Sequence, residues 1–276
     1  MAIKLGIVGG GVMGEALLSR LIDQQLYHPE AVLISEPQAQ RREFLVQRYG
    51  VKVTSDNRAA AAASDVLLLA IKPQVFEAVA TELTQGGGDR TTWEKNGPVV
   101  VSILAGVSLN QLEAAFKEQP VIRAMPNTPA TVGAGITAIA RGKTVSNSQL
   151  QQVIAIFQSV GEVVEIPESL MDAVTGLSGS GPAYVAILIE ALADGGVAAG
   201  LPRAIASQLA LSTVLGTAQL LQQSELHPAQ LKDRVTSPGG TTIAGITQLE
   251  RAGFRSALIE AVLAAKERSR QLGSAN

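Results

Sequence analysis

Three glycines near the start of the chain, Gly9, Gly11 and Gly14, stand at a spacing that suits an anion-binding turn. Glycines at this spacing let the backbone turn tightly and bring its N–H groups close to a pyrophosphate. Val12 and Met13 belong to the same turn. Glycine spacing alone is weak support, because a flexible loop or the tip of a hairpin contains similar residues. The neighbouring elements decide between these alternatives.

The segments around these glycines have the pattern of a strand, a turn and a helix. Residues 3–8 form a short apolar run of strand length, and apolar residues recur at helical spacing over 17–22. Glu36 follows a second predicted strand at 31–35, about twenty positions after the turn, where a carboxylate bonds the adenosine ribose of a dinucleotide. Together these features predict a dinucleotide site at residues 9–14.

The residues around the predicted ribose site give a divided signal about the coenzyme. Glu36 favours NADH, because a carboxylate accepts hydrogen bonds from ribose hydroxyls and repels a 2′-phosphate. Ser35, Arg41, Arg42 and Asn57 are close in sequence, and one arginine over the ribose could pair with that phosphate. The alternative is that both arginines lie on the solvated face of a helix. We therefore expect either NADPH or NADH as the coenzyme.

Two further segments follow predicted strands, at the edge where an open parallel sheet binds ligands. Ala70, Lys72 and Pro73 come after an apolar strand, and the lysine either faces a phosphate or ribose or is an ordinary solvated side chain. Asn127 stands between two prolines that fix the backbone, so its amide has a rigid setting. The alternative for that segment is a stiff turn. We expect all four residues to contact the coenzyme.

Two hydroxyl-rich and glycine-rich segments, 175–182 and 236–242, each precede a predicted helix. Hydroxyls and exposed backbone N–H groups at the start of a helix form a suitable receptor for a carboxylate. Their repetition predicts a small anionic substrate in the second half of the chain.

Composition excludes several classes of protein. The chain of 276 residues is 46% hydrophobic and 17% charged, which is typical of a globular protein with a real core. The absence of cysteine excludes disulfides, thiolate zinc sites and a cysteine nucleophile, and we expect no metal site. A net charge of −2 lacks the basic footprint of nucleic-acid binding. With no uninterrupted apolar run of membrane-spanning length and no signal-peptide pattern, we expect a cytoplasmic protein.

Strand and helix patterns alternate up to about Pro167, and helical patterns follow almost throughout. Continuous apolar strands between helices indicate a parallel sheet that is buried on both faces. We therefore predict an α/β protein: an N-terminal Rossmann-type doubly wound parallel sheet at residues 1–167 and an all-helical C-terminal domain at 168–276. The glycines of 176–182 predict a break in the first of these helices.

The predicted helices at 183–197 and 204–221 are apolar around most of their circumference. Such helices need cover on several sides, and a domain of about a hundred residues has little bulk to provide it. We expect dimerisation through these helices; the alternative is a compact monomeric bundle.

Five stretches together resemble pyrroline-5-carboxylate reductases: 9–14, 70–73, 125–129, 177–184 and 232–242. The resemblance spans nearly the whole chain, and its last two stretches are specific to that family. It implies reduction of 1-pyrroline-5-carboxylate to L-proline by NADPH or NADH. It also implies homodimers built from swapped C-terminal helices, which assemble further, often into a decamer.

The resemblance also assigns residues to the reaction. Thr175 matches a threonine beside the ring nitrogen, and Glu225 matches a residue nearby, so these two are the expected catalytic residues. The loop that matches 237–242 holds the substrate carboxylate. The expected substrate-binding residues are Ser178, Ser237, Gly239, Gly240, Thr241 and Thr242.

Hydride addition to an iminium carbon agrees with the residues available, because the substrate begins positive at nitrogen and needs no strong acid. A β-hydroxyacid dehydrogenase is the alternative, but its catalytic lysine and asparagine would fall at Val185 and Ile189. His28 and His227, both next to prolines, read as surface residues. A coenzyme-binding regulator without turnover is a third possibility, which the two substrate-like loops argue against.

Overall fold

The computed structural model describes residues 2–85, 97–117 and 119–274, and their contacts divide the chain into two compact units. Unit 1 consists of residues 1–179 and 265–276, and unit 2 of residues 180–264. Residues 86–88 are three consecutive glycines, which predict a surface loop, and they lie outside the described residues. The predicted domain boundary after Pro167 divides the chain by function as well as by structure, and it stays a prediction.

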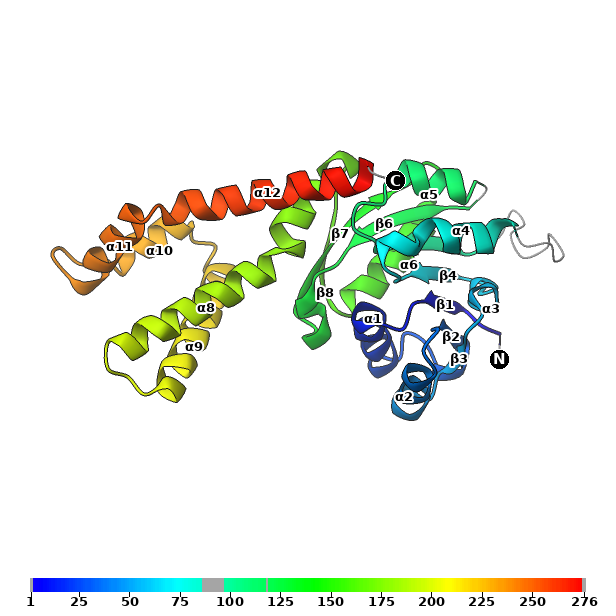
Figure 1. Ribbon diagram of the computed structural model, residues 1–276, viewed down its shortest axis with the longest axis horizontal. Coiled ribbons are helices and arrows are strands. Elements are labelled where there is room, and N and C mark those ends of the chain that lie inside the picture. The colour runs from blue at the N-terminus through cyan, green and yellow to red at the C-terminus, as the bar shows by residue number, and fades with distance from the viewer. Residues whose placement is uncertain (1, 86–96, 118, 275–276) are drawn as a thin grey trace. The chain divides into compact units, whose positions relative to one another are not determined.

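Unit 1 contains an eight-stranded sheet in the order β3-β2-β1-β4-β5-β6-β7-β8 (Figure 1). The strands β1 to β6 are parallel, whereas β7 runs antiparallel to β6 and parallel to β8. This topology confirms the predicted doubly wound sheet and adds a reversed pair at one edge. The strands are β1 Leu5–Val8, β2 Val32–Ser35, β3 Lys52–Thr54, β4 Val66–Leu69, β5 Val99–Ser102, β6 Val121–Met125, β7 Gly135–Arg141 and β8 Gly161–Glu165.

Helices cover both faces of this sheet and form two separate apolar cores. Leucines of α1, α2 and α6 pack in one core, and residues of α3, α4, α5 and α7 pack in the other. The helices of unit 1 are α1 Val12–Asp23, α2 Ala39–Tyr49, α3 Asn57–Ala61, α4 Phe76–Gln85, α5 Leu109–Ala115, α6 Asn147–Gln158 and α7 Met171–Val174, with short 3-10 turns η1 Pro29–Ala31, η2 Pro73–Val75, η4 Thr128–Val132 and η5 Glu168–Leu170.

The structure differs from the predicted break near Gly176, because the chain there continues as the π-helical turn η6 (Thr175–Gly179) and then as α8 (Gly181–Ala198). The Thr175 hydroxyl donates to the carbonyl of Met171 at 3.0 Å, and Ser178 donates in the same way to Val174 at 3.2 Å. Such bonds to the carbonyl four residues back distort a helix without ending it. A π-turn inside a longer helix often marks a functional site.

Unit 2 is helical in all of its described elements, and most of its apolar side chains are exposed. By length and composition, the stretches Glu168–Ala198 and Arg203–Ser224 are long and apolar enough to cross a membrane. In the apolar 18-residue part of each stretch, however, only 6% and 11%, respectively, is buried. These stretches qualify by mean hydropathy, whereas the expectation concerned uninterrupted apolar runs, and Glu190 and Asp194 interrupt the first stretch. The elements are α8, α9 Arg203–Ser224, α10 Pro228–Arg234, α11 Thr241–Arg251 and the start of α12 Phe254–Ser274, whose end belongs to unit 1.

Candidate active site

The glycine turn between β1 and α1 has the geometry of an anion cradle. Gly9 has a φ of +105°, and a Cβ added there would lie 2.5 Å from the carbonyl oxygen of Ala70. A Cβ on Gly14 would lie 2.3 Å from the carbonyl oxygen of Gly9, so this position also requires glycine. Gly11 has open space around it, and no side chain caps the helix that starts at Val12. The first N–H groups of α1 therefore suit a pyrophosphate.

Side chains hold the middle residue of this turn, Gly10, at both of its backbone polar groups. The Gly10 N–H donates to Oε2 of Glu36 at 3.0 Å, and its carbonyl accepts from Nε of Arg41 at 2.7 Å. Arg41 also forms an ion pair with Glu15, which accepts the hydroxyl of Tyr49 at 2.7 Å. We call Glu15, Glu36, Arg41 and Tyr49 the loop clamp. Sequence reasoning did not find Glu15 or Tyr49.

The loop clamp sets the charge state of its own members. Partial burial alone would raise the pKa of Glu15, but hydrogen bonds from Arg41 and Tyr49 outweigh burial and lower that pKa below its usual value. Burial and the neighbouring Glu15 raise the pKa of the Tyr49 hydroxyl. At neutral pH the carboxylate is therefore charged and the phenol keeps its proton, as their hydrogen bond requires.

The predicted ribose residues lie together at the carboxyl end of β2. Glu36 is buried, and its second carboxylate oxygen accepts the backbone N–H of Gln38 at 3.0 Å. The hydroxyl of Ser35 donates to Oδ1 of Asn57 at 2.7 Å, and the Asn57 amide donates to Glu82 at 2.8 Å. The structure thus brings Ser35, Glu36 and Asn57 to one corner of the sheet.

The remaining predicted coenzyme residues follow β4 and β6. Ala70 contacts the glycine turn, Lys72 is exposed at the start of η2, and Pro73 is the first residue of that turn. Asn127 precedes η4, and its Oδ1 accepts the backbone N–H of Ile136 at 3.0 Å, so this side chain also holds the start of β7. These positions are the carboxyl ends of parallel strands, where an open sheet binds its ligands.

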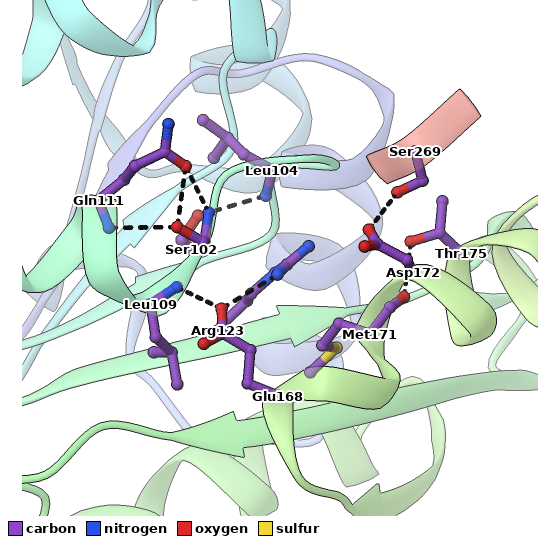
Figure 2. A network of polar contacts seen from close by, with 11 residues as sticks. Ser102, Leu104, Leu109, Gln111, Arg123, Glu168, Met171, Asp172, Thr175 and Ser269 are labelled. Carbon is purple, nitrogen blue, oxygen red and sulfur yellow. Dashed lines mark hydrogen bonds and ion pairs between the residues drawn. The ribbon is translucent and has the colours of Figure 1, made fainter. Parts of the chain in front are cut away.

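A polar network anchors the segment that carries Thr175 to the rest of unit 1 (Figure 2). The Arg123 side chain, which is 6% exposed, donates from Nη1 to Oε1 of Glu168 at 3.1 Å. The same carboxylate accepts the backbone N–H of Leu109 at the start of α5. One turn further along, Asp172 accepts the hydroxyl of Ser269 in α12 at 2.7 Å. Both anchors precede Thr175, and neither was predicted.

Thr175 lies close to the carboxyl end of β6. A Cβ added to Gly179, in the same π-turn, would lie 2.9 Å from the terminal methyl of Met125 and 3.8 Å from a methyl of Thr175. The π-turn therefore packs on the last residue of β6, at the carboxyl edge of the sheet that also carries the glycine turn. Ser178 belongs to the same turn and is half-buried.

The predicted carboxylate loop in unit 2 is a tight turn that opens α11. Gly239 has a φ of +67°, and a Cβ on Gly240 would lie 2.4 Å from Oγ of Ser237. Thr241 and Thr242 are the first two residues of the helix, whose first turn contains no acidic residue. Hydroxyls and the N–H groups of this helix start thus form one polar surface without negative charge, which suits a carboxylate.

The second expected catalytic residue belongs to the other compact unit. Glu225 caps the end of α9 with a φ of +54° and is exposed in unit 2, whereas Thr175 belongs to unit 1. A pairing of the two therefore stays a prediction. His227 caps α10, where its Nδ1 accepts the backbone N–H of Ala229 at 3.2 Å, and both histidines are exposed.

Comparison with known proteins identifies relatives along the whole chain. Residues 168–272 match the family model described as pyrroline-5-carboxylate reductase dimerisation, and residues 4–106 match NADP oxidoreductase coenzyme F420-dependent. A pyrroline-5-carboxylate reductase of Synechocystis sp. is 61% identical over 273 residues, which cover 99% of each chain. That of Methanosarcina acetivorans is 45% identical over 98% of each chain.

Solved structures agree with the sequence relatives. A pyrroline carboxylate reductase of Plasmodium falciparum with NADP bound matches with a TM-score of 0.87 and 32% identity, covering 98% of each chain. A pyrroline-5-carboxylate reductase of Coxiella burnetii matches with a TM-score of 0.87 and 33% identity, covering 99% of each chain. The chain belongs to the pyrroline-5-carboxylate reductase family.

Proposed function

We propose that the chain reduces 1-pyrroline-5-carboxylate to L-proline with NADPH or NADH. The observation that supports this proposal is the packing of the Thr175 turn on Met125, because Met125 ends a strand at the sheet edge that also bears the glycine cradle. The identity of 61% over nearly the full chain to a pyrroline-5-carboxylate reductase supports the same substrate.

Unit 1 supplies the residues that would hold the coenzyme, and the bound coenzyme would supply the hydride. Backbone N–H groups of the glycine turn would bind its pyrophosphate, and Ser35, Glu36 and Asn57 would hold the region of the adenosine ribose. Lys72 would face a phosphate or ribose of the coenzyme, and Asn127 would contact it from the carboxyl end of β6. The full set is Gly9, Gly11, Val12, Met13, Gly14, Ser35, Glu36, Asn57, Ala70, Lys72, Pro73 and Asn127.

Thr175 orients the substrate nitrogen. Its hydroxyl hydrogen is used in the bond to the carbonyl of Met171, so the oxygen presents lone pairs outward. A protonated imine has an N–H that fits such an acceptor, and reduction leaves a neutral amine that needs no further proton at that step. Glu225 would add negative charge that favours the iminium form.

The start of α11 holds the substrate carboxylate. Its N–H groups and hydroxyls offer charge-assisted hydrogen bonds, which are about twice as strong as neutral ones. We assign Ser178, Ser237, Gly239, Gly240, Thr241 and Thr242 to this task.

The exposed apolar helices of unit 2 indicate how the protein assembles. We assign residues 1–167 to coenzyme binding and residues 168–276 to substrate binding and dimerisation. A second copy of the chain covers α8 and α9, and the dimers assemble further, for example into a decamer. In this arrangement the two apolar helices are an oligomer core instead of membrane spans, and the enzyme works in the cytoplasm without nucleic acid or membrane.

Coenzyme oxidation, followed by the absorbance of reduced nicotinamide, tests the substrate. We expect oxidation of NADPH or NADH that depends on pyrroline-5-carboxylate and yields L-proline. Reduction of the oxidised coenzyme by a β-hydroxyacid, without activity on the imine, would favour the dehydrogenase alternative. Coenzyme binding without turnover of either substrate would instead indicate a regulator.

A further inference from the structure

We propose that Arg42 recognises the 2′-phosphate of NADPH, while its neighbours Arg41 and Glu36 are committed to holding the glycine turn. The inference rests on the proposed function only in taking a nicotinamide dinucleotide as the ligand of unit 1. It assigns the coenzyme preference, which the sequence leaves open, to one side chain.

Glu36 is turned toward the protein. Its two carboxylate oxygens accept the N–H groups of Gly10 and Gln38, each at 3.0 Å, and only 8% of the residue is exposed. Each backbone N–H offsets part of the negative charge that would otherwise repel a phosphate. Glu36 therefore acts as a brace for the turn and is a weak selector against NADPH.

Arg41 is committed to the loop clamp. Its Nε donates to the carbonyl of Gly10 at 2.7 Å, and Nη2 pairs with Glu15. The guanidinium carbon also lies over the Phe44 ring, 4.9 Å from its centre, which adds a cation–π contact. A phosphate could recruit Arg41 only by breaking the contacts that shape the pyrophosphate turn.

Arg42 uses only one of its guanidinium nitrogens in the hydrogen bonds found among the described residues. Its Nη1 donates to the carbonyls of Glu36 at 2.7 Å and Pro37 at 2.8 Å, the two residues that directly follow β2. Within the described residues its Nε and Nη2 donate no hydrogen bond, and no carboxylate lies within ion-pair distance. The backbone after β2 is where the adenosine ribose lies in this fold, so the free edge of the guanidinium borders the 2′ position.

These contacts predict a preference for NADPH. A phosphate at the 2′ position gains charge-assisted hydrogen bonds from a guanidinium that is already held in place. A 2′-hydroxyl gains much less from the same group. NADH remains a usable coenzyme, because the glycine turn binds the pyrophosphate that both coenzymes share.

Calorimetric titration of the full-length protein with NADP⁺ and with NAD⁺, without substrate, tests the assignment. We expect Arg42→Gln to weaken NADP⁺ binding by about tenfold or more and NAD⁺ binding by less than about twofold. Arg42→Lys keeps the charge without the fork of donors and should retain part of the preference. Raising the salt concentration should reduce the preference of the unmodified protein.

Three matched variants separate this role from general effects. Arg41→Gln should weaken both coenzymes by a similar factor, because it loosens the shared turn. Lys52→Gln removes one exposed charge at the start of β3 and should change neither affinity. Glu36→Gln should leave the ratio of the two affinities unchanged.

Some results would overturn the assignment. These are an unchanged affinity ratio in Arg42→Gln, a shift of about tenfold toward NADP⁺ in Glu36→Gln, or failure of the unmodified protein to bind NADP⁺. Normal coenzyme binding combined with no reduction of pyrroline-5-carboxylate would overturn the proposed substrate alone.

Discussion

Unit 1 and unit 2 bury their apolar residues in opposite ways. Strands β1, β4 and β5 are buried along their whole length, and helices of the same chain cover both faces of their sheet. In unit 2, by contrast, Leu209, Leu211 and Leu215 of α9 are each more than half exposed. A stable protein does not leave so large an apolar surface in water. Unit 1 therefore buries its strands within one chain, whereas the apolar helices of unit 2 need a second copy to cover them.

A charge on the exposed face of α9 should have the largest effect on assembly and activity. If it had no effect, the contrast between the two units would not hold. Leu215→Glu places a carboxylate in the proposed interface, where burial of an unpaired charge costs several kcal/mol. We expect loss of the dimer in light scattering and loss of most activity, whereas Leu215→Met, which keeps an apolar side chain of similar volume at the same position, should change little. A dimeric and fully active Leu215→Glu protein would contradict the proposed role of this surface.

The buried end of β6 offers a second test, on the stability of unit 1. Arg123→Met leaves the Glu168 carboxylate without its guanidinium, and breaking a buried pair costs about 3 to 5 kcal/mol. Because the Glu168 side chain is 27% exposed, we expect about 2 kcal/mol in urea unfolding. The solvent-exposed pair of Arg255 and Glu250 is the control, and Arg255→Gln should cost less than about 1 kcal/mol. Equal losses of stability in both variants would show that the Arg123–Glu168 pair does not anchor the Thr175 segment.

The two units should also respond differently in catalysis. Thr242→Val in unit 2 removes a hydroxyl from the carboxylate loop, so we expect a raised KM at a cost of about 1.5 to 3 kcal/mol. Thr175→Val in unit 1 removes the acceptor for the ring nitrogen and should mainly lower kcat. Steady-state kinetics of both variants separate the roles. Unchanged kinetics of Thr242→Val would remove that residue from the site, and an effect on KM alone would reduce Thr175 to a binding contact.

The loop clamp predicts the smallest effect, a decrease in folding stability at acidic pH. The pKa of Glu15 is lower in the folded protein than its ordinary value of 4.5, so the stability that this group contributes is present above about pH 4.5. That contribution is lost as the pH falls through the lowered, folded-state pKa. Unfolding measured across this range should show a smaller loss for Glu15→Gln than for the unmodified protein. Identical profiles would mean that the Arg41 and Tyr49 contacts do not stabilise the charged form.

Local patterns account for the parts of unit 1 that were predictable. Continuous apolar runs marked the strands, and glycine spacing marked the turn, because each depends on neighbours in sequence. The helices α3 and α5 were missed because five and seven residues are too few to establish a helical period. The π-turn was missed because its glycines and hydroxyls resemble a break.

Contacts between distant residues explain what could not be predicted. The loop clamp joins Glu15 to Arg41 and Tyr49, which are 26 and 34 positions away, and the anchor of Thr175 joins Arg123 to Glu168 across 45 positions. No local period encodes such pairs. The all-round apolar helices did predict a need for cover beyond their own unit, because that property belongs to each helix alone.

Transfer of deuterium tests the central claim, hydride addition to the imine carbon, most directly. The enzyme would be given coenzyme deuterated on the transferred face of the nicotinamide ring, and the proline would be examined by mass spectrometry and NMR. The account predicts one deuterium per proline, on the ring carbon next to nitrogen that carries no carboxylate. Proline without deuterium, or deuterium at any other carbon, would contradict it.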